Sequence, residues 1–390
     1  MRLIETHVTP RLDGRHRLTG VVEYADNSRE DYWFELPSEY FPSLSGNPWL
    51  AILLPLAATL GEDLEIDLPV DPSLLLGVDA VMRLWRKWYP KMHLVQVRAP
   101  HVEPIHTRPT DVASFFSAGV DSTYTVLRRP DATTWITVHG FDMPLANAEA
   151  FEQHQSRLAR IANDYGKRFV AVATNIRETR WRHAHWEAVS HGPALTSVGL
   201  LFESYFGEIL IPSSYDYDSL DPWGSHPLLD TQYSTLRTKF VHDGVALSRT
   251  EKIGYLAEHE RAMRELHVCY RGADSKGQDH QNCSRCEKCY RTMIALDLFG
   301  KLDDAILFDR KKFEMDRVRK IYISHVLDDK FFISLSRTAA ESKRFDVVEA
   351  IEFARRRSRR IKRLEVLTRM PVLWRAGIAL QKRLLRDAPR

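Results

Sequence analysis

The chain has 390 residues and a net charge of +3, and its 44% hydrophobic and 27% charged residues exclude a disordered or fibrous protein. This length predicts two or three domains. No apolar run reaches the roughly 18–20 residues that a membrane span needs, and the start of the chain contains no apolar leader, so we expect a cytoplasmic protein.

The charge is unevenly distributed along the chain. Residues 353–390 contain 13 Lys+Arg and 2 Asp+Glu, whereas the rest of the chain carries 42 basic and 50 acidic side chains. This asymmetry indicates either a basic tail with a partner of its own or a solvated helical end.

Residues 1–106 are expected to form an accessory α+β domain. Leu18–Tyr24 and Asp31–Leu36 are β-rich, and the polar stretch between them predicts a hairpin. Apolar residues at helical spacing and a short alternating run then predict two helices and a strand, at Trp49–Leu60, Pro72–Tyr89 and Leu94–Val97. The region contains no cluster of catalytic residue types, so we interpret it as accessory or substrate-selecting.

Residues 107–300 are expected to form the main domain. Helical stretches alternate with β-rich runs at Val112–Phe116, Thr134–Val138, Phe169–Ala173 and Ile209–Ile211. This alternation predicts a parallel sheet in a doubly wound α/β fold. A long irregular segment, Pro212–Asp230, follows, and Ser248 with Glu251 predicts a capped helix after it. Residues 301–390 are expected to form a helical, basic C-terminal region.

The clearest motif follows the first strand of the main domain and reads Phe115-Phe116-Ser117-Ala118-Gly119-Val120-Asp121-Ser122-Thr123. Small residues lead from a strand into a helix, whose N–H groups and dipole form an anion site. Ser117 and Ser122 can donate to phosphate oxygens, and Asp121 can hold a bridging Mg²⁺. An ordinary strand–turn–helix is the alternative, but open α/β sheets bind ligands at this location. As a loop carboxylate, Asp121 is expected to contribute little to packing.

All four cysteines fall in one short region, with the spacing C-x13-C-x2-C-x2-C. Thiolates two residues apart can share one Zn²⁺, and the predicted ligands are Cys269, Cys283, Cys286 and Cys289. Four cysteine ligands leave no open position, so such a zinc is structural. An iron–sulfur cluster is the alternative, because it uses similar spacings.

The loop resembles the SGGxDS PP-loop of the adenine nucleotide α-hydrolase superfamily, with Ala118 at the second position of the pattern. Together with C…CxxCxxC on its C-terminal side, it resembles the 7-cyano-7-deazaguanine synthase-like (QueC-like) family over about residues 110–300. The resemblance implies a HUP/PP-loop type α/β fold and an ATP-dependent carbon–nitrogen ligase that forms AMP and pyrophosphate. A carboxylate, such as a deazaguanine-type acid, is adenylated in that reaction and then coupled to ammonia or an amine, giving an amide or a nitrile.

The resemblance also implies a set of site residues. Asp121 and Ser122 would act in catalysis, and ATP and Mg²⁺ would be bound by Ser117, Ala118, Gly119, Val120, Asp121 and Ser122. The main chain of Val138, His139 and Gly140 would approach the adenine. Arg249 and Lys252, in the capped helix, are candidates for the phosphates or the substrate carboxylate, with a solvated helix start as the alternative.

Other functions remain open at this point. A PP-loop enzyme that modifies tRNA or another nucleic acid by sulfur transfer is the nearest alternative, but the metal spacing leaves no cysteine to carry sulfur. The carboxylate substrate is a small molecule or a protein. The basic tail, including residues 355–363, is expected to contact RNA or an anionic membrane surface, unless it packs on its own protein as a plain helix. Association into a homodimer is a further expectation.

Overall fold

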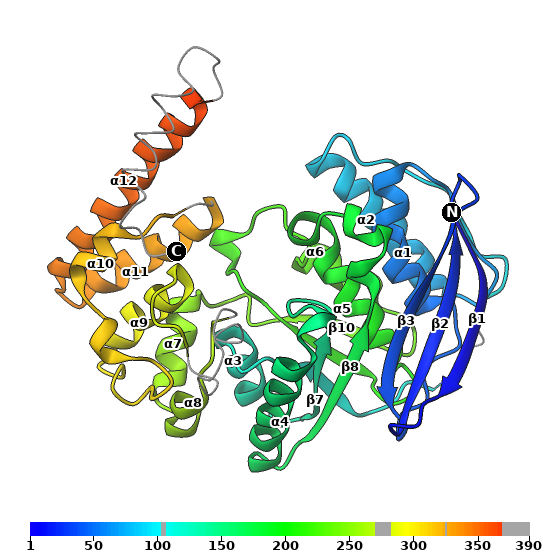
Figure 1. Ribbon diagram of the computed structural model, residues 1–390, viewed down its shortest axis with the longest axis horizontal. Helices are drawn as coiled ribbons and strands as arrows, with labels where there is room; N and C mark the ends of the chain where they lie inside the picture. The colour runs from blue at the N-terminus through cyan, green and yellow to red at the C-terminus, as the bar shows by residue number, and fades with distance from the viewer. Residues whose placement is uncertain (103–106, 270–281, 324–325, 369–390) are drawn as a thin grey trace. The chain divides into compact units, whose positions relative to one another are not determined.

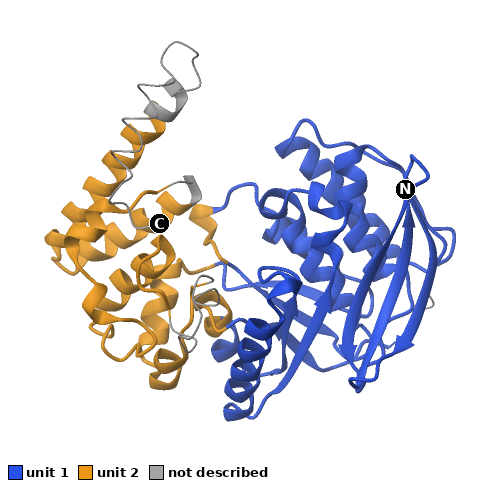
Figure 2. Cartoon of the chain, viewed as in Figure 1, with its two compact units in different colours: residues 1–117, 125–213, 220–245 blue, residues 118–124, 214–219, 246–390 orange. Residues whose placement is uncertain are grey.

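A computed structural model describes residues 1–102, 107–269, 282–323 and 326–368 (Figure 1). The chain divides into two compact units (Figure 2). Unit 1 comprises residues 1–117, 125–213 and 220–245, and unit 2 comprises residues 118–124, 214–219 and 246–390. These divisions differ from the expected boundaries near residues 106 and 300. Within the described part of the chain, no helix combines the length and apolar character needed to cross a membrane.

Unit 1 is built on a ten-stranded sheet in the order β10-β9-β6-β7-β8-β3-β2-β1-β4-β5. Its strands are β1 Arg2–Pro10, β2 Arg15–Glu23, β3 Arg29–Pro37, β4 Leu64–Ile66, β5 Val97–Arg98, β6 Val112–Phe115, β7 Ala132–His139, β8 Arg168–Thr174, β9 Glu208–Pro212 and β10 Lys239–Asp243. The α-helices of this part of the chain are α1 Asn47–Leu60, α2 Pro72–Trp88, α3 Val120–Arg128, α4 Ala148–Asp164, α5 His191–Leu200 and α6 Pro227–Asp230.

Five neighbouring strands, β6 to β10, are all parallel to one another. The sequence predicts the parallel arrangement of the first four, and β10 extends it. Numbered along the chain, they lie in the order 3-2-1-4-5, which is a doubly wound arrangement. The direction of winding reverses between β6 and β9, so α5 crosses on the opposite face from α3 and α4. The chain leaves β6 at this switch point and enters the loop that begins at Ser117.

The other half of the sheet is an antiparallel meander of β1, β2 and β3. The predicted hairpin is confirmed, since β2 and β3 pair along their whole length. The sequence did not predict that β3 also pairs antiparallel with β8, through Phe34 opposite Thr174. The N-terminal strands therefore extend the parallel sheet instead of forming a domain of their own. The strand expected at Leu94–Val97 is reduced to the two residues of β5, and β1, β4 and β10 were not predicted.

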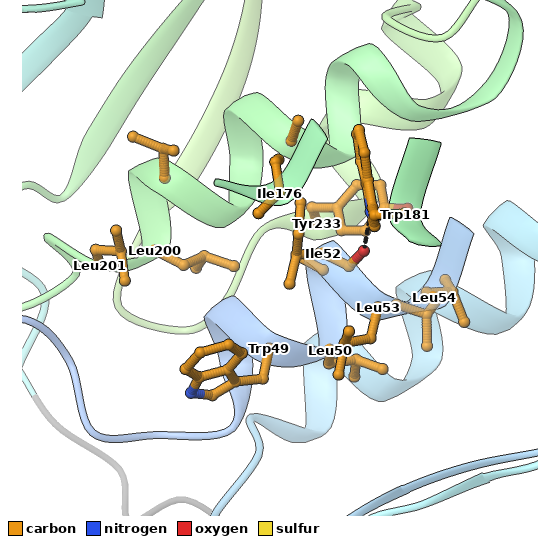
Figure 3. Close-up of a cluster of buried hydrophobic side chains, with 14 of the residues drawn as sticks. Trp49, Leu50, Ile52, Leu53, Leu54, Ile176, Trp181, Leu200, Leu201 and Tyr233 are labelled. Carbon is orange, nitrogen blue, oxygen red and sulfur yellow. Dashed lines mark hydrogen bonds between the residues drawn. The ribbon is translucent and has the colours of Figure 1, made fainter. Parts of the chain in front are cut away.

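The N-terminal region shares the hydrophobic core of unit 1 with the later segments of the chain. Helix α1 has 12 buried residues and is apolar around its whole circumference, as expected of a helix enclosed by protein. Figure 3 shows its side chains packed against Ile176, Trp181 and Leu200 from later segments. The indole N–H of Trp181 donates to the carbonyl of Ile52 at 2.6 Å. Helix α1 thus lies at the centre of a core that later segments complete.

Unit 2 is helical, as the sequence after Gly300 predicts. Its α-helices are α7 Arg249–Ala257, α8 Glu260–Glu265, α9 Glu287–Leu298, α10 Met315–Lys320, α11 Val326–Glu341 and α12 Phe345–Thr368. The predicted capping box is confirmed at α7, where Ser248 and Glu251 exchange side-chain and backbone hydrogen bonds. Ser334 of α11 donates to Thr250 at 3.0 Å, which ties α11 to the first turn of α7.

Candidate functional site

The loop between β6 and α3 makes a tight turn at Ala118. Its φ of 57° lies in the left-handed region, where glycine has no steric cost but alanine is strained. The N–H of His267 donates to the Ala118 carbonyl at 2.9 Å and holds this turn. Helix α3 then begins with the Thr123 N–H bonded to the Gly119 carbonyl at 2.9 Å, and the Ser122 hydroxyl donates to the same carbonyl at 3.3 Å.

Asp121, in the first turn of α3, meets both basic residues predicted for the phosphates. The Arg249 guanidinium donates to both carboxylate oxygens of Asp121, and the Lys252 Nζ lies 3.6 Å from its Oδ1. The Ser214 hydroxyl donates to Oδ2 at 3.4 Å. The Arg249 and Lys252 side chains are only 12% and 1% exposed, so they do not form a solvated helix start.

This cluster fixes the charge of Asp121. Burial raises the pKa of its carboxyl group, but the positive charges of Arg249 and Lys252 and the hydrogen bond from Arg249 outweigh burial, so the pKa lies below its ordinary value. The carboxylate is therefore ionised at neutral pH. The expectation that it contributes little to packing is wrong, because it compensates a lysine that is almost fully buried.

Helices α9 and α11 add residues that the sequence did not single out. The guanidinium carbons of Arg249 and Arg291 lie 4.4 and 4.3 Å from the centre of the Phe331 ring, and Tyr215 stacks on that ring at 5.2 Å. The Lys288 charge also contributes to the lowered pKa of Asp121. Tyr215, Arg249, the α9 residues and Phe331 are far apart in the chain and have no common motif, so no sequence signal could have grouped them.

The residues proposed to approach adenine lie at the carboxyl end of β7, the neighbour of β6 in the sheet. The His139 ring stacks on Phe151 at 4.1 Å, and its Nε2 lies 3.0 Å from the Pro144 carbonyl oxygen. Burial lowers the pKa of His139, so it is neutral at pH 7. The N–H of Gly140 donates to the Met143 carbonyl at 3.0 Å. Val138 is half-buried, and the Gly140 N–H is already bonded within its own loop.

The four cysteines converge, with all their Sγ atoms within 4.8 Å of one another. Cys269 and Cys286 are 3.9 Å apart, and Cys283 and Cys289 are 3.7 Å apart. A tetrahedron with Zn–S bonds of about 2.3 Å has S–S edges of about 3.8 Å, so the cluster fits one such ion. A [4Fe–4S] cluster places irons and sulfides between its thiolates and spreads them further.

The long irregular segment is not one loop. Residues 214–219 belong to unit 2 and residues 220–230 to unit 1. The Gly224 N–H donates to the Glu187 carbonyl at 2.7 Å, and the Gly224 carbonyl accepts from the Gly192 N–H at 2.7 Å. Residues 220–230 are thereby fixed to the rest of unit 1. His226 caps α6 by accepting from the Leu228 N–H, and burial lowers its pKa to about 4. It is a neutral structural histidine.

A buried dyad in unit 1 also escaped prediction. Asp230, fully buried, lies 2.7 Å from His242 Nδ1 and accepts a 2.7 Å hydrogen bond from Ser225. His242 is at the carboxyl end of β10, so it shares the ligand-binding edge of the parallel sheet with Ser117. Asp230 precedes β10 and His242 lies within it. Because β10 was not predicted, the sequence did not indicate that these two residues are close.

No protein-family model, no curated protein and no solved structure matched the chain.

Proposed function

We propose that the protein is an enzyme that cleaves ATP to AMP and pyrophosphate, adenylates a carboxylate, and couples it to ammonia or an amine. One observation carries this proposal: a small-residue loop leaves the sheet at its switch point and presents Asp121, paired with Arg249 and Lys252, at the start of a helix. Cations, helix N–H groups and one carboxylate are the groups that a magnesium–polyphosphate requires.

The charges of the cluster support this ligand. In the structure, the Asp121 carboxylate forms ion pairs with both Arg249 and Lys252. A polyphosphate would take the place of the carboxylate at both cations, and Asp121 would become available as a Mg²⁺ ligand. Mg²⁺ bound there would neutralise charge on the phosphate oxygens. Because the cations and N–H groups already face the loop, they would stabilise charge that develops at the α-phosphoryl group with little reorganisation.

The cysteine cluster favours ligation over sulfur transfer. All four cysteines of the chain lie in one cluster, so no other thiol can carry a persulfide. We infer that the cluster holds one structural Zn²⁺, since four thiolates leave no open position. One zinc per chain by elemental analysis is expected, and iron in comparable amount would overturn this assignment.

The test of the ATP reaction follows the nucleotide products. We expect Mg·ATP to give AMP and pyrophosphate, with ATP–pyrophosphate exchange stimulated by the correct member of a panel of carboxylic acids, including deazaguanine-type acids. Arg249→Gln should reduce exchange at least tenfold. Arg264→Gln is the matched control, because Arg264 is an exposed arginine of the same unit that pairs with Glu260. ADP and phosphate as products would refute the proposal.

A second candidate substrate is RNA, and one observation favours it. Helix α12 exposes Arg356, Arg359, Arg360 and Arg363, and no acidic residue interrupts residues 353–364. The remainder of the expected basic tail, residues 369–390, lies outside the described residues. Oxygen-18 transfer separates the two candidates: label from a carboxylate substrate appears in AMP if a carboxylate is adenylated. Unlabelled AMP, formed only when RNA is added, would favour modification of a base.

A further inference from the structure

Two structural elements of unit 2 contact or carry both the cysteine cluster and the groups around the loop at Ala118–Ser122. The first is the segment 266–269, which follows α8 and ends at Cys269. Its residue His267 donates the backbone hydrogen bond that holds Ala118 in the left-handed turn. Asn282, next to Cys283, clamps the same segment: it accepts from the Val268 N–H at 2.8 Å and donates to the Leu266 carbonyl at 3.0 Å.

The second shared element is α9. Cys286 is the N-cap of this helix and Cys289 lies in its first turn, so the cysteine centre fixes where the helix begins. The same first turns carry Lys288 and Arg291. Lys288 and Arg291 are three residues apart and so lie on the same face of α9. Arg291 faces the Phe331 ring that Arg249 also faces.

Arg291 has an unsatisfied group that indicates a ligand. Its side chain is 7% exposed, and Nη1 is bonded to Glu287 at 3.2 Å and to Asp328 at 3.1 Å. Its buried Nε meets no hydrogen-bond acceptor among the described residues. Buried guanidinium groups normally satisfy their N–H donors, so an anion bound beside Arg249 would supply the missing acceptor.

We propose that Lys288 and Arg291 are further polyphosphate-binding residues, and that the four-cysteine metal centre positions them and the Ala118 turn, so that metal and polyphosphate bind cooperatively. This inference rests on the proposed function, because it assumes that the loop binds a polyphosphate. Coupling of this kind is reciprocal: if the metal strengthens polyphosphate binding, the polyphosphate must retain the metal to the same degree.

The first experiment uses inorganic pyrophosphate with Mg²⁺ and the full metal-bound chain. Calorimetric titration of Lys288→Gln should show at least fivefold weaker binding, with the zinc content unchanged. Arg291→Lys, which keeps the charge but loses the Nε donor, should also weaken binding. Lys301→Gln is the matched control, because Lys301 is an exposed lysine just after α9 that pairs with Asp304.

The second experiment measures zinc transfer to a chromogenic chelator with and without saturating magnesium pyrophosphate. We expect pyrophosphate to slow transfer at least fivefold in the parent chain and to leave it unchanged in Arg249→Gln, which controls for direct chelation by pyrophosphate. If the parent binds pyrophosphate but its zinc transfer is unaffected and Lys288→Gln binds normally, the inference is overturned while the proposed function stands. If the parent binds no magnesium pyrophosphate, both are overturned.

Discussion

Replacing Asp121 by asparagine tests the charge balance of the loop. Asn keeps the size of the side chain and one oxygen acceptor but removes the negative charge opposite Arg249 and Lys252. Breaking a buried ion pair costs about 3–5 kcal/mol. Asp121 and Arg249 retain 15% and 12% exposure, so solvent screening reduces the expected cost below this range, to about 2–3 kcal/mol. For a unit of this size, that corresponds to a fall in Tm of roughly 5–10 °C.

The assay is thermal unfolding with and without pyrophosphate and Mg²⁺. Without Mg²⁺, pyrophosphate should stabilise Asp121→Asn more than the parent, because it supplies the missing negative charge without competing with a carboxylate. With Mg²⁺ the order should reverse, because the variant lacks the carboxylate ligand.

The control for this prediction is Asp304→Asn, which removes a carboxylate that is 47% exposed and pairs with Lys301. Its effect should be below about 1 kcal/mol, as for surface ion pairs in general. The reasoning is refuted if Asp121→Asn melts within 1 °C of the parent, or if its response to pyrophosphate shows the same Mg²⁺ dependence as that of the parent.

Three further predictions concern the metal, the turn and a buried histidine. Cys286→Ser should lose zinc and lower the Tm, because three thiolates bind the ion less tightly; a folded variant with full zinc would contradict this. Ala118→Gly should melt no lower than the parent, because an alanine in the left-handed region costs about 1–2 kcal/mol. Ala118→Val should melt lower. Equal melting temperatures of the two variants would show that the backbone at residue 118 is not strained. Burial lowers the pKa of His226 to about 4 from 6.5. Between these two pH values the unfolded chain binds more protons than the folded chain. The free energy of unfolding therefore falls as the pH decreases from 6.5 to about 4, by about 3 kcal/mol in total. Urea unfolding between pH 7.5 and 4.5 should show a weaker pH dependence in His226→Asn, which retains an N-cap acceptor, and identical slopes would exclude this assignment.

Local patterns in the sequence predicted many of the helices and strands. The hairpin of β2 and β3, the capped helix at Ser248 and the parallel strands depend on residues within a few positions of one another, so alternation, caps and spacing are sufficient to find them. The candidate loop and the cysteine cluster were identified for the same reason, because each is a short motif with a fixed spacing.

The tertiary structure decided which of these elements belong together. The pairing of β3 with β8 joins Phe34 to Thr174, and it moves the N-terminal region from a separate domain into the main sheet. The near-complete burial of Lys252 and the approach of Arg291 to Phe331 depend on how α7, α9 and α11 pack. A sequence fixes the chemistry of each side chain and the local path of the chain, whereas strand partners, buried charges and ligand-facing groups depend on contacts between distant residues, which no local pattern encodes.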